Sequence, residues 1–141
     1  MPDEVIGVVV AAHGRFASGL LSAVEVIIGT QDALTAVDLG AEESPEGFGE
    51  RLAAASGGHP AGTLFLTDLP GATPFKAAAR LARDGTTARV VAGVNLPMLL
   101  EVLMGRGGRG LAEIAETAGE TGRAGVVPFD PGPAAARPDD R

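Results

Sequence analysis

The sequence predicts an α/β protein, a single domain in which helices cover both faces of a parallel sheet. Short apolar runs alternate with segments of helical periodicity, an order typical of parallel strands joined by right-handed crossovers. The first run, VIGVVVA at residues 5–11, is apolar at consecutive positions, as a strand buried on both faces should be. A length of 141 residues with 45% hydrophobic content fits one domain with one core. In such sheets, ligands bind beyond the carboxyl ends of the strands.

The remaining elements follow in the same alternating order. A helix begins at Phe16, keeps a period near 3.6 through Leu20, Val24 and Ile27, and ends at Gly29. Ser44 is the expected N-cap of the next helix. Further strands are predicted at 34–39, 63–67 and 88–93, with a last short one, AGVVPF, at 124–129, and further helices at 44–55, 74–83, 97–104 and about 111–121.

Composition excludes several classes of protein. The net charge of −7, with only 11 Lys and Arg, argues against nucleic acid and against an anionic membrane surface as partners. The absence of cysteine removes disulfides, thiolate zinc sites and cysteine nucleophiles. The N-terminal residues MPDE are not those of a signal peptide, so we expect a cytoplasmic protein. The expected domain covers residues 1–129, and the Pro- and Ala-rich residues 130–141 form a flexible tail.

Two titratable residues are predicted to meet at one edge of the sheet. His13 lies just past the first strand and Asp68 just past the third, and the carboxyl ends of parallel strands share an edge. Gly14 lets the backbone approach closely, and the amides that begin the next helix favour an anion. Thr67 and Thr73 flank the loop after the third strand. A histidine, a carboxylate and a helix N-terminus suit a phosphoryl group held on nitrogen, with Gly14, Thr67 and Thr73 as phosphate-binding residues.

Other chemistries lack their sequence signals. There is no G-x-S-x-G nucleophile elbow and no glycine-rich nucleotide fingerprint after the first strand, so neither a hydrolase triad nor a cofactor is expected. A metal site needs more ligands than His13 and Asp68 provide. The second histidine, His59, lies in the turn SGGHPAG and is expected to be exposed to solvent.

Over residues 5–128 the chain closely resembles the enzyme IIA component of the mannose family of the sugar phosphotransferase system. The segments that carry this resemblance are VVVAAHGRFASGLL, LFLTDLPGATPF, VVAGVNLPMLLEVLM and ETGRAGV. The resemblance implies that His13 is the phosphorylated histidine and that Asp68 supports it. It also implies a phosphoryl donor, the small phosphocarrier HPr, an acceptor, the enzyme IIB component, and membrane contact only through the transporter complex. The sugar is not readable, because specificity in these systems resides in the membrane components.

The loop DLPGATPF departs from the family, whose loop is usually richer in glycine, with serine before the proline. Thr73 keeps the hydroxyl and the expected N-cap role, whereas Pro70 and Ala72 stiffen the loop and put its mobility and partner choice in question. The family fold is a dimer that exchanges a C-terminal strand, here residues 124–129. Sequence alone does not distinguish this homodimer from pairing of the strand within its own chain.

Two alternative functions stay open at this point. One is a phosphocarrier for dihydroxyacetone kinase, a similar family that usually has serine after the histidine, where this chain has Gly14. The other is a noncatalytic regulatory module of flavodoxin-like fold, in which His13 only binds an anion. The pairing of His13 with Asp68 favours phosphoryl transfer over simple binding.

Overall fold

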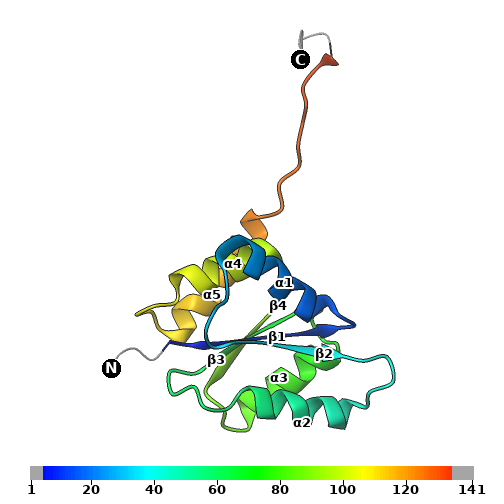
Figure 1. The fold of residues 1–141 in the computed structure, drawn as a ribbon, viewed down its shortest axis with the longest axis vertical. Coiled ribbons are helices and arrows are strands. Elements are labelled where there is room, and N and C mark those ends of the chain that lie inside the picture. Colours follow the sequence, from blue (N-terminus) through cyan, green and yellow to red (C-terminus); the bar gives the residue numbers. More distant parts are fainter. Residues whose placement is uncertain (1–4, 135–141) are drawn as a thin grey trace.

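The computed structural model describes residues 5–134 and contains one parallel sheet with helices on both sides (Figure 1). The strands lie in the order β2-β1-β3-β4, and Val10 of β1 pairs with Ala36 on one side and Leu66 on the other. The elements are β1 (Gly7–His13), α1 (Phe16–Ile28), β2 (Leu34–Leu39), α2 (Pro45–Ala55), β3 (Thr63–Thr67), α3 (Thr73–Arg83), β4 (Ala88–Ala92), α4 (Leu96–Gly105) and α5 (Leu111–Ala124). The α/β prediction is therefore confirmed.

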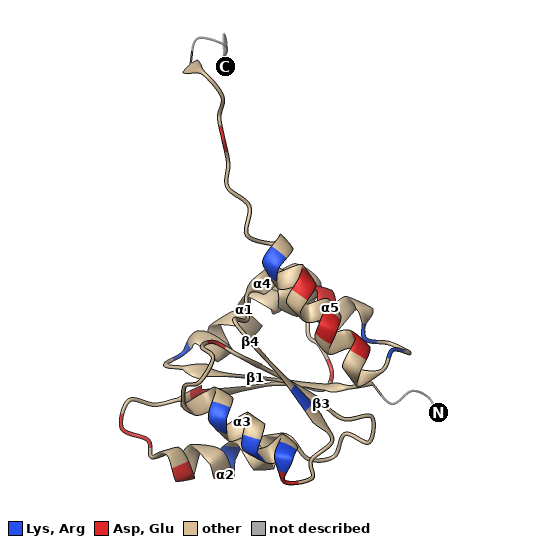
Figure 2. Ribbon diagram, turned by 180° about the vertical axis from the view of Figure 1, so that it is seen from behind, with Lys and Arg blue, Asp and Glu red and all other residues tan. Residues whose placement is uncertain are grey.

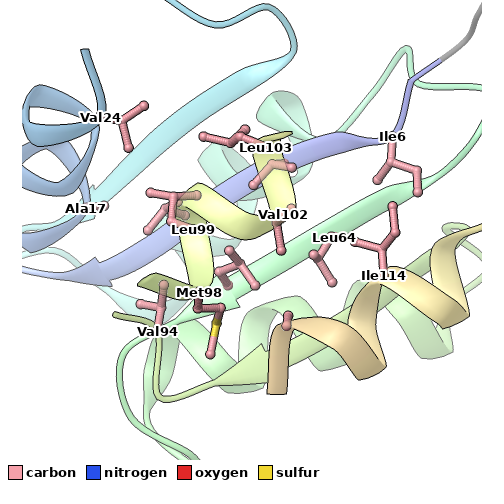
Figure 3. Packing of buried hydrophobic residues seen from close by; sticks show 14 of the residues in the cluster. Ile6, Ala17, Val24, Leu64, Val94, Met98, Leu99, Val102, Leu103 and Ile114 are labelled. Atoms are coloured by element: carbon pink, nitrogen blue, oxygen red, sulfur yellow. The ribbon is translucent and has the colours of Figure 1, made fainter. Parts of the chain in front are cut away.

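Alternate residues of β1 belong to two separate cores. Val8 and Val10 pack with α1, α4 and α5 on one face, and Figure 3 shows this larger core. Val9 and Ala11 pack with α2 and α3 on the other face. Because both faces are covered, the interior of β1 is buried throughout, which explains why its sequence is apolar without alternation.

The strand predictions for 34–39 and 63–67 are confirmed residue by residue. The first strand is shifted, because it starts at Gly7 and includes His13 as its last residue. At the other end of the chain, α5 continues through Gly122 to Ala124, three residues beyond its predicted end at about residue 121. A tertiary contact explains the extension: a Cβ on Gly122 would lie 2.6 Å from Met98 Cε, so glycine lets α5 pack closely on α4.

The segment AGVVPF does not form the predicted strand in this chain. Its first residue ends α5, and among the described residues the rest pairs with no strand. Val126, Val127 and Phe129 are 74%, 76% and 86% exposed, and the segment leads away from the domain (Figure 1). Pairing of the segment within its own chain is therefore not observed, because within residues 5–134 it forms no ladder with any of the four strands. Residues 135–141 of the predicted tail lie outside the described part.

Across residues 5–134, no helix combines the length and the apolar character needed to cross a membrane.

Candidate active site

His13 ends β1 at the carboxyl edge of the sheet, where β3 delivers Asp68 beside it. Asp68 Oδ2 accepts a hydrogen bond from the backbone N–H of His13 at 2.9 Å and lies 2.7 Å from His13 Nδ1. The side chain of His13 is 47% exposed, whereas that of Asp68 is 15% exposed. The structure thus brings together the two residues that sequence analysis singled out.

The same carboxylate oxygen holds both the backbone and the ring of His13, so the ring has a defined orientation. A carboxylate only accepts hydrogen bonds, so Nδ1 carries the proton of this contact and Nε2 of the neutral ring keeps its lone pair. No described residue hydrogen-bonds to Nε2. The arrangement presents an unprotonated, accessible nitrogen, which is what a nucleophilic histidine requires.

The pKa of Asp68 is shifted below its ordinary value. Burial acts to raise the pKa of this carboxyl, but hydrogen bonds from the His13 backbone, the His13 ring and the Leu69 amide, together with the charge of His13, outweigh burial. Asp68 is therefore ionised at neutral pH. An ionised partner at Nδ1 stabilises positive charge that develops on the ring.

Gly14 makes the turn between β1 and α1. Its φ is 58°, in the left-handed region, and its amide donates to Leu39 O at 2.9 Å. A Cβ here would meet nothing within 4 Å in the described chain, so within the chain it is the backbone conformation that requires glycine. The amides of Arg15, Phe16 and Ala17 follow this turn and have no acceptor in the described chain, which leaves donors beside His13.

The environments of Thr67 and Thr73 differ from those predicted for phosphate-binding residues. Thr67 is completely buried, and its hydroxyl is the buried side-chain group without a hydrogen-bond partner in the described chain. The phosphate contact predicted for Thr67 stays a prediction, and the burial of its hydroxyl does not favour it. Thr73 is half-buried and is the first residue of α3, whereas the N-cap is Ala72, which makes no side-chain cap. The N-cap role predicted for Thr73 is wrong, and its hydroxyl makes no hydrogen bond within residues 5–134.

His13 is exposed at the carboxyl edge of the sheet and lines neither of the two hollows described for residues 5–134. A hollow of about 540 Å³ lies between α2 and α3, and of the predicted site residues only Thr73 lines it. Two exposed apolar side chains adjoin the site, Phe16 (46%) and Leu69 (56%), which sequence reasoning did not identify. Leu69 could have been identified from the sequence, because it directly follows Asp68 in the loop after β3. Within residues 5–134, no group of three or more His, Asp or Glu could hold a metal ion.

His59 packs its ring against the start of β1. It is half-buried, so the expected exposure is wrong, and a Cβ on Gly7 would lie 2.3 Å from its ring. The ring therefore covers the start of β1, at the opposite edge of the sheet from His13.

The fold and the site together define an α/β domain that presents a carboxylate-bound histidine at the open edge of a parallel sheet. The chain belongs to the mannose-type IIA family of the phosphotransferase system: the family model described as "PTS system fructose IIA component" matches residues 7–118.

Curated relatives and solved structures agree with this membership. The chain is 38% identical to the mannose-specific EIIAB component of Escherichia coli over 94% of its own length, but it spans only 45% of that relative. It is 35% identical to the sorbose-specific EIIA component of Lacticaseibacillus casei, covering 67% of this chain and 70% of the relative. The mannose/sorbose-specific IIA subunit from Enterococcus faecalis superposes with a TM-score of 0.82 at 30% identity, over 89% of this chain and 96% of that one.

Proposed function

We propose that the chain is a phosphocarrier of a sugar phosphotransferase system, in which His13 accepts a phosphoryl group and passes it on. The observation that carries the proposal is the 2.7 Å contact between His13 Nδ1 and Asp68, which leaves Nε2 of an exposed side chain without a hydrogen-bond partner in the described chain. Membership of the IIA family supports the same reading. The alternative of a noncatalytic module gives no reason for a carboxylate that orients an accessible imidazole.

The transfer step uses groups that are already in place. The lone pair of Nε2 attacks the phosphorus of a phosphohistidine donor, the bond from phosphorus to the donor nitrogen breaks, and the donor ring keeps that electron pair. His13 retains its Nδ1 proton, so its ring becomes positively charged and the ionised Asp68 stabilises that charge. The free amides at the start of α1 and the hydroxyl of Thr73 are donors for the phosphoryl oxygens. The reverse sequence hands the group to the next carrier.

The proposed partners are HPr as donor and an enzyme IIB component as acceptor. An open edge suits a protein partner, because a macromolecule brings its own surface to exclude water, whereas a small substrate needs a cavity. Phe16 and Leu69 are exposed apolar side chains where such a surface would dock. The proposal places the chain in the cytoplasm, with the membrane reached only through the transporter complex. The relatives carry the names of different sugars, so no sugar is assigned.

We further propose that the chain forms a homodimer by exchange of the segment after α5. β4 is an edge strand, and a hollow of about 330 Å³ beside it is lined by Val91, Met98 and Val126 among others. Val126, Val127 and Phe129 are exposed in the single chain and would be covered if they paired with the edge of a partner's β4.

A truncation tests the dimer without disturbing α5. A chain that stops after Gly125 keeps the whole helix and removes the apolar segment, and a chain that stops after Phe129 is the matched control. Sedimentation should find the first monomeric and the second dimeric. A folded dimer of the shorter chain would contradict strand exchange.

A labelling experiment tests the phosphocarrier role. Phosphoenolpyruvate, enzyme I and HPr should transfer one phosphate to each chain, in the acid-labile, base-stable form of a phosphohistidine. His13→Ala should accept none, and His59→Ala should accept as much as the unaltered chain. Label that persists in His13→Ala and disappears in His59→Ala would reject the assignment.

A further inference from the structure

Asp38, at the carboxyl end of β2, holds the first turn of the helix that follows His13. Its neighbours Val37 and Leu39 pack on the α2 and α3 face, so the side chain of Asp38 lies on the α1 face. Oδ2 accepts from the hydroxyl of Ser18 at 2.7 Å, and Oδ1 accepts from its backbone N–H at 3.1 Å. β2 and α1 are thereby joined through both oxygens of one carboxylate.

This contact replaces a cap that α1 lacks. The N-cap residue is Arg15, whose side chain has no acceptor and makes no capping hydrogen bond. An N-cap side chain ordinarily accepts from the amide three positions later, and that position is Ser18. Asp38, on strand β2, therefore caps α1 in place of the side chain of Arg15.

The turn that carries His13 is fixed at both ends by β2. Leu39 O accepts from the Gly14 amide, directly after His13, and Asp38 binds Ser18 inside α1. Asp68 holds His13 itself from the other side, through β3. The residues between His13 and Ser18 are thus enclosed by bonds to both neighbouring strands.

We propose that Asp38 is a positioning residue for phosphoryl transfer, acting through Ser18 and α1 to fix the turn that presents His13 Nε2. The inference rests on the proposed function of His13. In-line transfer depends on the placement of the attacking nitrogen, and small displacements of a reacting group cost large factors in rate. Asp38 does not touch the ring of His13 and is not a catalytic residue.

Three variants separate positioning from charge. Asp38→Ala removes both bonds and should lower kcat for phosphoryl transfer by about tenfold with KM for the donor unchanged. Asp38→Asn loses the charge but keeps an acceptor for the Ser18 amide and a donor for its hydroxyl, so transfer should stay within about threefold of the unaltered chain. Glu42→Ala is the matched control, because it deletes a carboxylate from the loop after β2 that makes no hydrogen bond or ion pair in the described chain. It should change nothing.

A second measurement keeps the test independent of activity. Nitrogen-15 relaxation of the His13 and Gly14 amides should show increased motion in Asp38→Ala and ordinary rigidity in Asp38→Asn. If the unaltered chain accepts no phosphate, the proposed function fails, while the relaxation result still decides whether Asp38 fixes the turn. Full transfer rate and a rigid turn in Asp38→Ala, or equal losses in the Ala and Asn variants, would overturn the proposal.

Discussion

The two edges of the sheet each carry a histidine, and their surroundings differ in every respect that matters for chemistry. At the carboxyl edge, His13 is exposed, bound to an ionised carboxylate and followed by amides that have no acceptor within residues 5–134. At the amino edge, His59 packs its ring on Gly7. The comparison teaches that the two histidines differ both in their end of the sheet and in what holds the ring, which is a carboxylate for His13 and packing on Gly7 for His59.

The amino edge is fixed by a buried cation. Arg106 is 6% exposed, and its guanidinium donates to the backbone carbonyls of Ile6, Asp32 and Ala33, which precede β1 and β2. Burial lowers the pKa of Arg106 and the charge of Asp32 partly offsets this, but the group stays charged at neutral pH. The amino edge is therefore held by a buried cation, and the carboxyl edge exposes the His13–Asp68 pair. Figure 2 shows where other charged residues lie, with basic residues along α3 and acidic residues along α5.

The largest expected effect on stability comes from the amino edge. Arg106→Met leaves the buried carbonyl of Ile6 without the guanidinium donor, whereas Ala33 O keeps its bond from the Val8 amide, so the free energy of unfolding should fall by about 3 kcal/mol. Urea denaturation at neutral pH measures this. Below the transition, the variant should still accept phosphate at His13. A destabilised chain that also fails to accept phosphate while folded would mean that the two edges are coupled.

The largest expected effect on reaction comes from the carboxyl edge. Asp68→Asn removes the charge that stabilises the ring in the transition state, so transfer should slow by about 10²-fold with the fold intact. Rapid-quench kinetics with phosphorylated HPr measure the rate, and circular dichroism checks the fold. An Asn variant that transfers as fast as the unaltered chain would reduce Asp68 to a loop anchor.

A smaller effect is expected where His59 covers Gly7. Gly7→Ala places a Cβ within 2.3 Å of the ring and should cost about 1–3 kcal/mol of unfolding free energy. Most of this loss should disappear in a His59→Ala background, because the clash is with that ring. Gly19→Ala, where a Cβ meets nothing within 4 Å, is the matched control and should stabilise α1 by about 0.5–1 kcal/mol. Equal costs of Gly7→Ala in both backgrounds would show that the ring does not restrict Gly7.

The smallest expected effect is a change with pH in the stability that Asp68 contributes. The pKa of Asp68 is lower in the folded chain than its ordinary 3.8, so its carboxylate contributes stability that is complete above that pH and lost as pH falls through the lowered value. The difference in unfolding free energy between the unaltered chain and Asp68→Asn should therefore shrink below pH 3.8. A difference that stays constant or grows in acid would contradict the lowered pKa.

Local sequence patterns predicted most of the fold. β2 and β3 were predicted residue by residue because their apolar runs are bounded by turn residues, and His13 and Asp68 because parallel strands end at a common edge. The strand at 124–129 was wrong for the single chain, because strand character needs a partner edge that this segment does not reach.

The errors around the site have tertiary causes. Asp38 and Ser18 are 20 positions apart, so their contact was not visible in a local pattern. A signal did exist: α1 starts at HGRF without a capping side chain, and the neighbouring strand ends with an aspartate. The N-cap of α3 was predicted at Thr73 and lies one residue earlier, at Ala72, a shift that is common at helix ends.

The most direct test of the site is to identify which ring nitrogen of His13 carries the phosphate. Phosphorus-31 and nitrogen-15 NMR of the phosphorylated chain, labelled in its histidine rings, distinguishes the two. Because Asp68 holds Nδ1 at 2.7 Å, phosphate should be bonded to Nε2, with Nδ1 still protonated. Phosphate on Nδ1 would require the ring to leave Asp68 and would contradict the orientation described above.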